Sequence, residues 1–287
     1  MSSALRTIAD GSRMKTFDII CAGEGGLEME TQAVSAPTFR PGGGAVKAAI
    51  ALARQGLRVG LATVLADDTF GRGLREEIAH TNVDAAGIAL SKPSSGLFLV
   101  RGGARQVVSF REEEQAVEIP LGWSSQVLLL SGMSPVVSHG AALCKAARAA
   151  RRAGSIVVVD VNARWQLWEG RDPRSIRMIL READVVWCSA EDLFGLNLDI
   201  AAMRSAMRAN AVLAMSDGLG KTWAMGPFGE LVRRFEARSS SLSMHRDDAF
   251  VTAICAELAR AGQAGPMNGD LWTRALDRGH LNAAGRS

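Results

Sequence analysis

A regular alternation of short apolar runs with amphipathic segments constrains the fold of the chain more than any other feature. Each apolar run has the length of a strand, and each amphipathic segment has the length of a helix. This alternation is typical of a parallel sheet that helices cover on both faces, with right-handed crossovers. Strands are predicted over Val127–Leu130, Ile156–Asp160, Val185–Cys188 and Ala211–Met215, and helices between them over Gly140–Ala153, Arg174–Glu182 and Ile200–Ala209.

The remainder of the chain extends the same pattern. Gly96–Val100 and Gln106–Phe110 alternate in character, which predicts a hairpin with one exposed face. The other predicted elements are strands over Phe17–Ala22 and Leu57–Val64, and helices over Ala45–Gln55, Gly71–His80, Asp247–Ala261 and about Leu271–Leu281. The sequence therefore predicts one α/β domain over residues 17–287, after a mobile N-terminal tail over residues 1–16.

Composition excludes several classes of protein. Hydrophobic residues make up 47% of the chain, which excludes general disorder. The formal net charge of +3 comes without a basic block, so nucleic acid is not an expected partner. No apolar run approaches the length of a membrane span, and the first residues lack the apolar core of a secretory signal. The four cysteines form no CxxC pair and are expected to be reduced, buried thiols, so we expect a cytoplasmic protein.

Polar residues gather where the predicted strands end, which is the edge at which doubly wound sheets bind ligands. Asp160-Val-Asn162-Ala-Arg164 follows a strongly apolar strand, and its polar groups are suited to a polyol or a phosphate. An Asp–Arg pair that holds the loop is the structural alternative. Gly42-Gly43-Gly44 precedes a helix, where glycines let a ligand approach the backbone amides. A plain turn explains these glycines equally well.

Two glycine-rich segments resemble nucleotide-binding motifs only in part. Ser216-Asp-Gly218-Leu-Gly220-Lys221-Thr222 lacks the first glycine of a P-loop, and a strand is predicted after it in place of a helix. A nucleotide-contacting turn and a simple hairpin turn both remain compatible with this segment. Gly23-Glu-Gly25-Gly26 is followed by Glu28 where the dinucleotide fingerprint needs its third glycine, so that fingerprint is excluded.

Asp248 stands near the start of a predicted helix, in the segment His245-Arg246-Asp247-Asp248-Ala249-Phe250. Carboxylates in a first helical turn are stabilised by the helix dipole, and this alone explains the two aspartates. The functional alternative is a general base beside a cluster of amides that receives an anion. The histidines show no metal-ligand spacing, and no GxSxG elbow is present.

Taken in order, these pieces resemble the ribokinase-like (PfkB) carbohydrate kinases from about Phe17 to the C-terminus. Each piece is short, and their order and spacing carry the resemblance. Asp160–Trp168 is most similar to the branch of 2-keto-3-deoxygluconate kinases and fructokinases. The segments are Pro41–Gly44 with Ala48–Gly56, Asp67–Arg72 with Asn82–Asp84, Ser95–Phe98, Phe110–Arg111, Leu130–Gly132, Asp160–Arg164 with Leu167–Trp168, Glu191–Leu193, Ser216–Lys221 and Asp248–Phe250.

The resemblance implies a fold, a reaction and a set of site residues. The fold is a mostly parallel sheet between helices, with a small β lid expected from about Gly26–Phe39 and Ser95–Val117. The reaction is transfer of the γ-phosphoryl group of ATP, with Mg²⁺, to a sugar hydroxyl, and relatives commonly dimerise through the lid. Asp248 matches the general base. In the kinase hypothesis given below, Arg246 and the amides at the helix start neutralise the phosphoryl group. Substrate positions match Glu28, Gly43, Gly44, Lys47, Arg111, Asn162 and Arg164, nucleotide positions match Ser189, Ser216, Gly218, Gly220 and Asn282, and Glu191 matches a metal position, with water between.

Several positions depart from the family pattern. The family's Gly-Ala-Gly before the base is His245-Arg246-Asp247 here, although those glycines let amides approach the transferring phosphoryl group. Glu28 and Lys47 replace an aspartate and an asparagine that contact the sugar. Cys188 replaces an asparagine on the metal side. These replacements indicate a different substrate or a loss of phosphoryl transfer.

Two hypotheses follow from the resemblance and its departures. The first is an ATP- and Mg²⁺-dependent kinase in which Lys47, Arg111 and Arg164 favour an acidic sugar such as a keto-deoxy acid. The second is a degenerate kinase fold that binds a sugar, a nucleotide or a protein partner without phosphoryl transfer.

Overall fold

The structure is a computed structural model of the 287-residue chain. It describes residues 14–30, 38–91, 96–101, 104–109, 116–134, 141–163, 168, 172–234 and 243–284, and only the backbone at 100–101, 104–109, 243–247 and 263–264. The first strand begins at Lys15, inside the predicted tail of residues 1–16. Residues 1–13 of that tail lie outside the described ranges.

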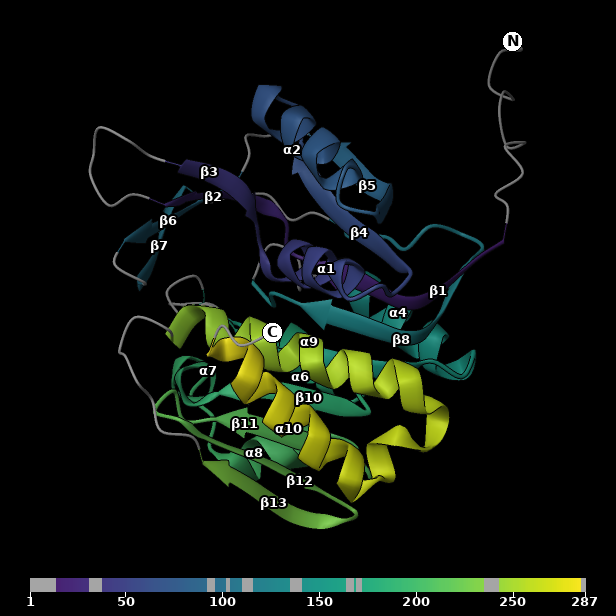
Figure 1. The fold of residues 1–287 in the computed structure, drawn as a ribbon, viewed down its shortest axis with the longest axis vertical. Helices are drawn as coiled ribbons and strands as arrows, with labels where there is room; N and C mark the ends of the chain where they lie inside the picture. The colour runs from purple at the N-terminus through teal and green to yellow at the C-terminus, as the bar shows by residue number, and fades with distance from the viewer. Residues whose placement is uncertain are drawn as a thin grey trace.

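A central sheet of nine described strands forms the middle layer of the molecule (Figure 1). The strands from β11 to β5 run parallel, and β12 and β13 add two antiparallel strands at one edge. This arrangement confirms the predicted, mostly parallel sheet. In spatial order the strands are β13 Gly229–Arg234, β12 Lys221–Gly226, β11 Val212–Ser216, β10 Val185–Ser189, β9 Ile156–Asp160, β8 Trp123–Ser131, β1 Lys15–Gly23, β4 Val59–Ala66 and β5 Val83–Ser91.

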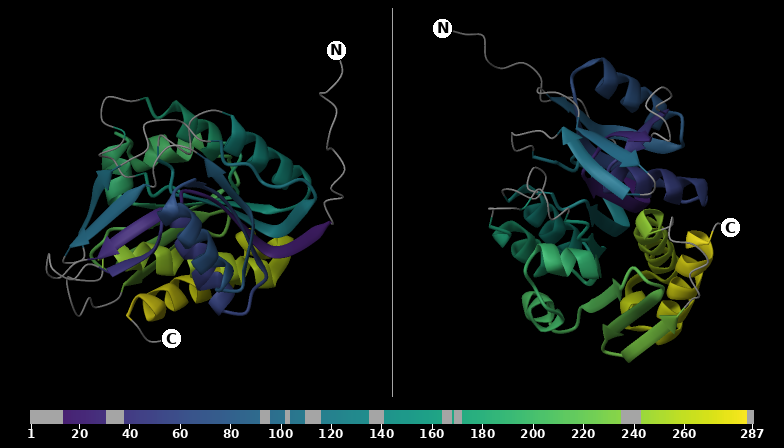
Figure 2. Two further views of the ribbon diagram at one scale, coloured as in Figure 1. Left: turned by 90° about the horizontal axis from the view of Figure 1, so that it is seen from above. Right: turned by 90° about the vertical axis from the view of Figure 1, so that its left-hand side faces the viewer.

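Helices cover both faces of this sheet (Figure 2). Helices α1, α2, α9 and α10 share one apolar cluster with the strands, and α4, α6 and α8 share a second cluster on the opposite face. The helices are α1 Gly44–Arg54, α2 Thr69–Ala79, α4 Ala142–Arg152, α6 Arg174–Leu180, α7 Ala190–Gly195, α8 Ile200–Ala206, α9 Ser243–Ala261 and α10 Gly269–Ala283, with a 3₁₀ helix η2 over Gly262–Met267.

Strand β8 explains why the central strands are continuous apolar runs. Val127 and Leu129 belong to the cluster under α1 and α9, whereas Leu128 and Leu130 belong to the cluster under α4. Successive side chains of a strand point to opposite faces, and here both faces are buried. The interiors of the central strands are therefore mostly apolar, and the polar side chains discussed below follow the strand ends.

A second sheet of four described strands projects from the main body beside α2 (Figure 1). Its order is β3-β2-β6-β7, with β2 parallel to β6 and the outer pairs antiparallel. Strands β2, β6 and β7 lie inside the two segments predicted for the lid, whereas β3 begins at Thr38 and continues past Phe39 to Gly42. The strands are β2 Gly26–Glu30, β3 Thr38–Gly42, β6 Leu97–Arg101 and β7 Ala104–Ser109.

Several elements differ from the sequence-based expectation, which also lacked helix α7 and the 3₁₀ helix η2. Strands β5 and β13 were absent from the prediction, because β5 is rich in alanine and β13 is a largely exposed edge strand with three charged residues. Helix α9 begins at Ser243, whereas the prediction placed its start at Asp247. No glycine or proline lies between Ser243 and Asp248, so nothing in the local sequence stops the helix from extending backwards.

The four cysteines are buried thiols that form no disulfide bond, as predicted. Burial raises the pKa of the Cys21 thiol in β1 and of the Cys255 thiol in α9, which keeps both thiols protonated. Among the described helices, none combines the length and apolarity that crossing a bilayer requires.

A buried carboxylate links two helices on the α4 face. Glu182, which follows α6, accepts hydrogen bonds from Arg148 Nη2 at 2.7 Å and from Arg151 Nη2 at 2.9 Å, both in α4. Burial acts to raise the pKa of Glu182, but the bonds from the two arginines outweigh it, so this pKa lies below its ordinary value. The folded state therefore favours the charged form of Glu182.

Replacing this carboxylate is expected to weaken the fold in a pH-dependent way. Glu182→Gln should lower the free energy of unfolding at pH 7 by about 1–3 kcal/mol, because charge-assisted hydrogen bonds are lost. Because the folded-state pKa is depressed, the wild-type advantage exists at neutral pH and is lost as pH falls through that pKa. Urea unfolding across this pH range measures the effect. Asp172→Asn is the control, since it removes an exposed pair with Arg174. A pH-independent difference would contradict the assignment.

Candidate active site

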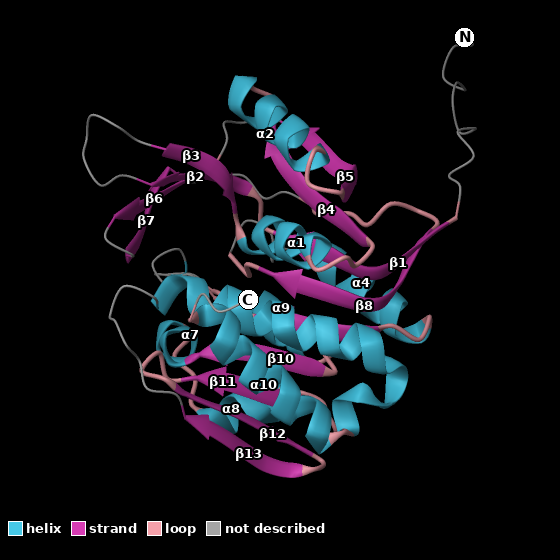
Figure 3. Ribbon diagram, viewed as in Figure 1, coloured by secondary structure: helices cyan, strands magenta, loops and turns pink. Residues whose placement is uncertain are grey.

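Two helix N-termini meet the carboxyl ends of the parallel strands on the side of the molecule that carries the small sheet (Figure 3). Helix α1 follows β3 directly, and α9 packs against α1, β1, β8 and β9. This is the edge at which the sequence predicted the ligand site. It is also the region in which most of the predicted site residues that the structure describes are found.

Glycines allow the start of α1 to approach the strand ends. Gly43 has a φ of +93°, and a β-carbon there would lie 2.4 Å from the carbonyl oxygen of Glu24, which follows β1. A β-carbon at Gly44 would lie 2.3 Å from Ser131 Oγ and 3.4 Å from Asn162 Nδ2. Packing within the protein therefore already requires glycine at both positions. The predicted Asn162 lies on the same wall as this turn.

Lys47 and Asp248 form an ion pair that joins α1 to α9, with Lys47 Nζ donating to Asp248 Oδ2. The two side chains are 14% and 20% exposed, so most of the pair is out of water. Lys47 lies one turn into α1, where its amide donates to Gly43 O at 3.1 Å. The structure thus brings the predicted base and a predicted substrate-contacting residue into direct contact, which the sequence did not indicate.

The early start of α9 changes what surrounds Asp248. The sequence placed Asp248 in a first helical turn, beside amides that are exposed to an anion. Because the helix begins at Ser243, Asp248 lies in the second turn instead. Only the first four amides of a helix lack a partner within it, so from Asp247 onward the amides belong to the helix ladder. The side chain of Arg246 lies outside the described part of the structure.

The loop after β9 is held from two sides. Ser131 Oγ donates to Asp160 Oδ2 at 2.6 Å, and both side chains are buried. The amide of Ala163 donates to Asp192 Oδ1 at 2.7 Å. Asp160 therefore has a structural role at the end of the sheet. The alternative of a pair between Asp160 and Arg164 falls outside the described residues, as does the predicted Arg111.

Asp192 is a structural residue beside the site that sequence reasoning did not single out. Its Oδ2 accepts from the amide and the hydroxyl of Ser189, both at 2.9 Å, while Ser189 Oγ accepts from the Asp192 amide at 3.1 Å. This reciprocal capping box begins α7. Ser189, predicted to contact nucleotide, is thus already a helix cap. The Ser-x-x-Asp spacing was the signal that would have found it.

The turn between β11 and β12 contains the predicted nucleotide-side glycines. Gly218 and Gly220 have φ values of +72° and +112°. Asp217 Oδ1 accepts from the amides of Leu219 at 2.7 Å and Lys221 at 3.0 Å, which closes the turn. Strand β12 follows antiparallel to β11, so the exclusion of a P-loop is confirmed. The predicted Ser216 is the last residue of β11 and is buried.

The end of α10 lies next to this turn. His280 Nε2 and Thr222 Oγ1 are 2.9 Å apart and buried, and the His280 ring meets the Phe250 ring edge-on. The predicted Asn282 lies in the same last turn of α10 and is half-buried. His280 therefore connects β12 to α9. In the sequence the histidines were tested only for metal-ligand spacing, and this test does not detect a packing contact of His280.

Two predicted polar residues lie away from the Lys47–Asp248 pair. Glu28 is fully buried in the small sheet, where its Oε2 accepts from Arg40 Nε at 3.2 Å. Glu191 is exposed in the first turn of α7, next to the end of β10. Within the described ranges, no three acidic, histidine or cysteine side chains cluster as metal ligands.

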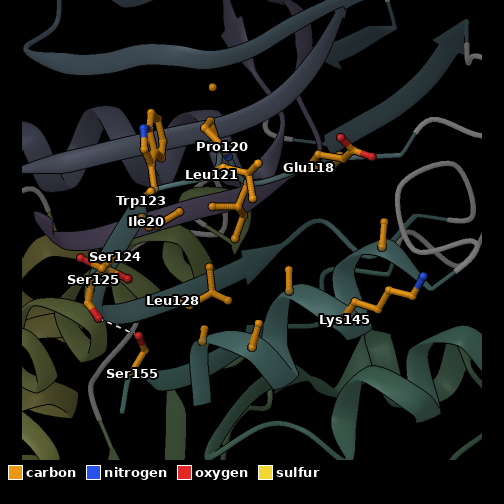
Figure 4. Close-up of a pocket in the computed structure, with 18 of the residues that line it drawn as sticks. Ile20, Glu118, Pro120, Leu121, Trp123, Ser124, Ser125, Leu128, Lys145 and Ser155 are labelled. Atoms are coloured by element: carbon orange, nitrogen blue, oxygen red, sulfur yellow. Dashed lines mark hydrogen bonds between the residues drawn. The ribbon is translucent and has the colours of Figure 1, made fainter. Parts of the chain in front are cut away.

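A separate cavity of about 950 Å³ lies on the α4 face, toward the amino ends of β8 and β9 (Figure 4). Alanines of α4 and residues of β5 and β8 line it, and Glu118 and Lys145 are the charged side chains on its wall. None of the predicted site residues contributes to this cavity.

The family of pfkB carbohydrate kinases matches residues 12–213 of the chain. A 5-dehydro-2-deoxygluconokinase from Clostridium perfringens is 24% identical over 206 residues, which is 62% of this chain and 59% of that protein. A protein of the same name from Shouchella clausii is 27% identical over 183 residues, or 56% of each chain. The match thus spans little more than half the length of these relatives.

Solved structures with the same fold cover nearly the whole chain. The fructokinase of Xylella fastidiosa with bound ATP has a TM-score of 0.74 at 23% identity, covering 94% of this chain and 91% of that one. The aminoimidazole riboside kinase of Salmonella enterica, in complex with aminoimidazole riboside and an ATP analogue, has a TM-score of 0.77 at 20% identity, covering 94% and 92%. At these sequence identities, the structural similarity shows a shared fold and nothing more.

The packing of Gly44 against β8 generates a prediction. Gly44→Ala should lower the free energy of unfolding by about 1–3 kcal/mol, because the new methyl group overlaps Ser131 Oγ. Ser131→Ala removes the overlapping atom, so the double variant should be more stable than the sum of the two single changes. A double-mutant cycle by urea unfolding measures this coupling. Additive effects would show that the two residues do not touch.

Proposed function

Because the chain belongs to the pfkB family of carbohydrate kinases, we propose that it transfers the γ-phosphoryl group of ATP to a hydroxyl group of a sugar or sugar acid. The observation that carries the proposal is the position of Asp248. It lies near the start of α9, against α1 and the carboxyl ends of the parallel strands. This is the edge at which open α/β sheets bind their ligands.

In the proposed reaction Asp248 is the general base. Its carboxylate accepts the proton of the acceptor hydroxyl as the hydroxyl oxygen forms a bond to the γ-phosphorus. The bond between that phosphorus and the bridging oxygen of ADP breaks in the same step, and ADP leaves with the electron pair. Positioning and electrostatic stabilisation supply most of the rate in such transfers. We assign Arg246 to the neutralisation of the transferring group.

Substrate and nucleotide approach Asp248 from different sides in this proposal. Gly43, Gly44, Lys47 and Asn162 line the sugar side, and Glu28 contributes through the small sheet. We assign Arg111 and Arg164 to the substrate from the resemblance alone. The nucleotide side consists of the β11–β12 turn with Ser216, Gly218 and Gly220, the start of α7 at Ser189, and Asn282 in α10. The ATP-bound fructokinase with the same fold supports ATP as the phosphoryl donor.

Magnesium fits this arrangement as a partner of the nucleotide. Mg²⁺ keeps several waters and binds through one or two carboxylates plus substrate phosphates, so a cage of protein ligands is not required. The exposed carboxylate of Glu191, at the end of β10, is the group that we assign to it through water. When bound, Mg²⁺ neutralises charge on the phosphate oxygens.

We also propose that the small sheet acts as a lid and as the contact between two copies of the chain. Phe39 in β3 and Phe70 in α2 are 50% and 60% exposed, and their ring centroids are 6.4 Å apart. An exposed aromatic pair beside an edge strand is suited to a symmetric contact. A cytoplasmic protein with free access to ATP fits the same proposal.

Two observations favour a second candidate function, which is ligand binding without phosphoryl transfer. Helix α9 runs through His245–Asp247, where the family has glycines that expose amides to the phosphoryl group. Asp248 is also already engaged by Lys47. A chain in which both features persist with ligand bound would hold a sugar or nucleotide without turnover.

The two candidates differ in whether the wild type releases ADP, and one substitution tests the assigned base. Asp248→Asn should lower ATP-dependent phosphorylation of a sugar or sugar acid by about 10²–10⁴-fold, because the general base is lost. ADP release is measured by a coupled assay over a panel of sugars and sugar acids. Asp84→Asn, which alters an ion pair with Lys15 at the opposite ends of the strands, is the control. Absence of ADP release from the wild type across the panel would favour binding without transfer.

A further inference from the structure

The pair between Lys47 and Asp248 occupies atoms that the proposed reaction needs. The Lys47 ammonium donates to Asp248 Oδ2, and within the described residues it makes no other hydrogen bond or ion pair. The carboxylate assigned as base is therefore engaged by a cation before any substrate is present. For the reaction to proceed, something must draw Lys47 away from Asp248.

Charge decides which ligand can separate the two side chains. Lys47 and Asp248 are 14% and 20% exposed, so neither charge is fully solvated when the pair opens. Opening a buried pair is costly when it leaves one charge without a partner. A neutral sugar offers only hydroxyl groups to Lys47. A sugar acid offers a carboxylate, the same chemical group that Asp248 presents.

The start of α1 favours a second carboxylate at this position. The N-cap residue Gly43 has no side chain to cap the helix, and the first turn of α1 contains no acidic residue. The amides at this end carry partial positive charge, which stabilises a nearby anion. Two carboxylates beside Lys47 therefore meet a second source of positive charge on the same helix.

We propose that Lys47 is a switch operated by the carboxylate of the substrate. The carboxylate of a sugar acid takes the Lys47 ammonium from Asp248, and the released Asp248 then accepts the proton of the acceptor hydroxyl. A neutral sugar leaves the pair closed and is a poor substrate. This inference rests on the proposed function and deepens it, because it makes the substrate class a sugar acid. Lys47 binds the substrate and acts on the chemistry through Asp248.

Binding without ATP tests the switch independently of turnover. The probe is 5-dehydro-2-deoxygluconate, titrated into the full chain by isothermal calorimetry. Lys47→Met should weaken its binding by about 10–100-fold, because a charge-assisted hydrogen bond is lost. Asp248→Asn should tighten it by severalfold, because the competing carboxylate is gone. Lys15→Met removes a similar Lys–Asp pair, with Asp84 at 2.6 Å, and should leave the affinity unchanged.

Turnover with two substrates provides the second readout. Lys47→Met should lower kcat/KM for 5-dehydro-2-deoxygluconate, mainly through KM, and should raise kcat for D-fructose, because the base is no longer engaged. Lys47→Arg retains the cation and should retain the preference for the acid. A purely structural role of Lys47 would instead lower turnover of both substrates together.

The outcomes separate this inference from the proposed function. Unchanged acid affinity in Lys47→Met, weaker binding in Asp248→Asn, or equal losses for both substrates would overturn the switch. Wild-type turnover of D-fructose as fast as the acid would also overturn it, while leaving the kinase proposal in place. Acid binding that responds as expected, without ADP release by the wild type, would support the carboxylate exchange and overturn the proposed phosphoryl transfer.

Discussion

The packing of Phe250 fixes the geometry on which the rest of the structure depends. Its ring stacks on Trp187 of β10 with centroids 5.1 Å apart, and it meets the His280 ring edge-on at 4.8 Å. Gly279 permits this approach, since a β-carbon there would lie 2.1 Å from Phe250 Cδ1. One aromatic side chain thus holds α9 to the sheet and α10 to α9. Asp248, which precedes Phe250 in the same helix, is positioned as a consequence.

Helix α1 is held as firmly as α9, and this limits how the site can respond to a ligand. Gly43 and Gly44 press the start of α1 against the ends of β1 and β8, with no room for a β-carbon. Both helices that carry the Lys47–Asp248 pair are therefore fixed by close backbone or aromatic contacts. Packed interiors resist continuous deformation. Rearrangement of side chains, rather than separation of helices, is the available way to open the pair.

The fold was predictable because it depends on the periodicity of apolar residues and on glycines that end helices and strands. The site instead depends on contacts between residues that are distant in the sequence. Continuous apolar runs such as Ile156–Asp160 identified parallel strands correctly, since burial on both faces leaves a strong signal. The outer strands β5 and β13 left only a weak signal in the sequence. Sequence placed Lys47 and Asp248 in the same site through a resemblance, but no local pattern pairs two residues 201 positions apart. The backward extension of α9 was likewise missed, because a helix start without a breaker has no sharp sequence signal.

The two main departures from the family pattern act on the same carboxylate. Loss of the glycines lets α9 continue back to Ser243, and gain of a cation at Lys47 engages Asp248. Stability alone gives little reason for this pair, because a largely buried ion pair contributes less than apolar packing of similar volume. The fold has that packing elsewhere, in Phe250 and the glycine contacts of α1. A charged pair at the ligand edge is therefore better explained by the charge of what binds there than by the needs of the fold.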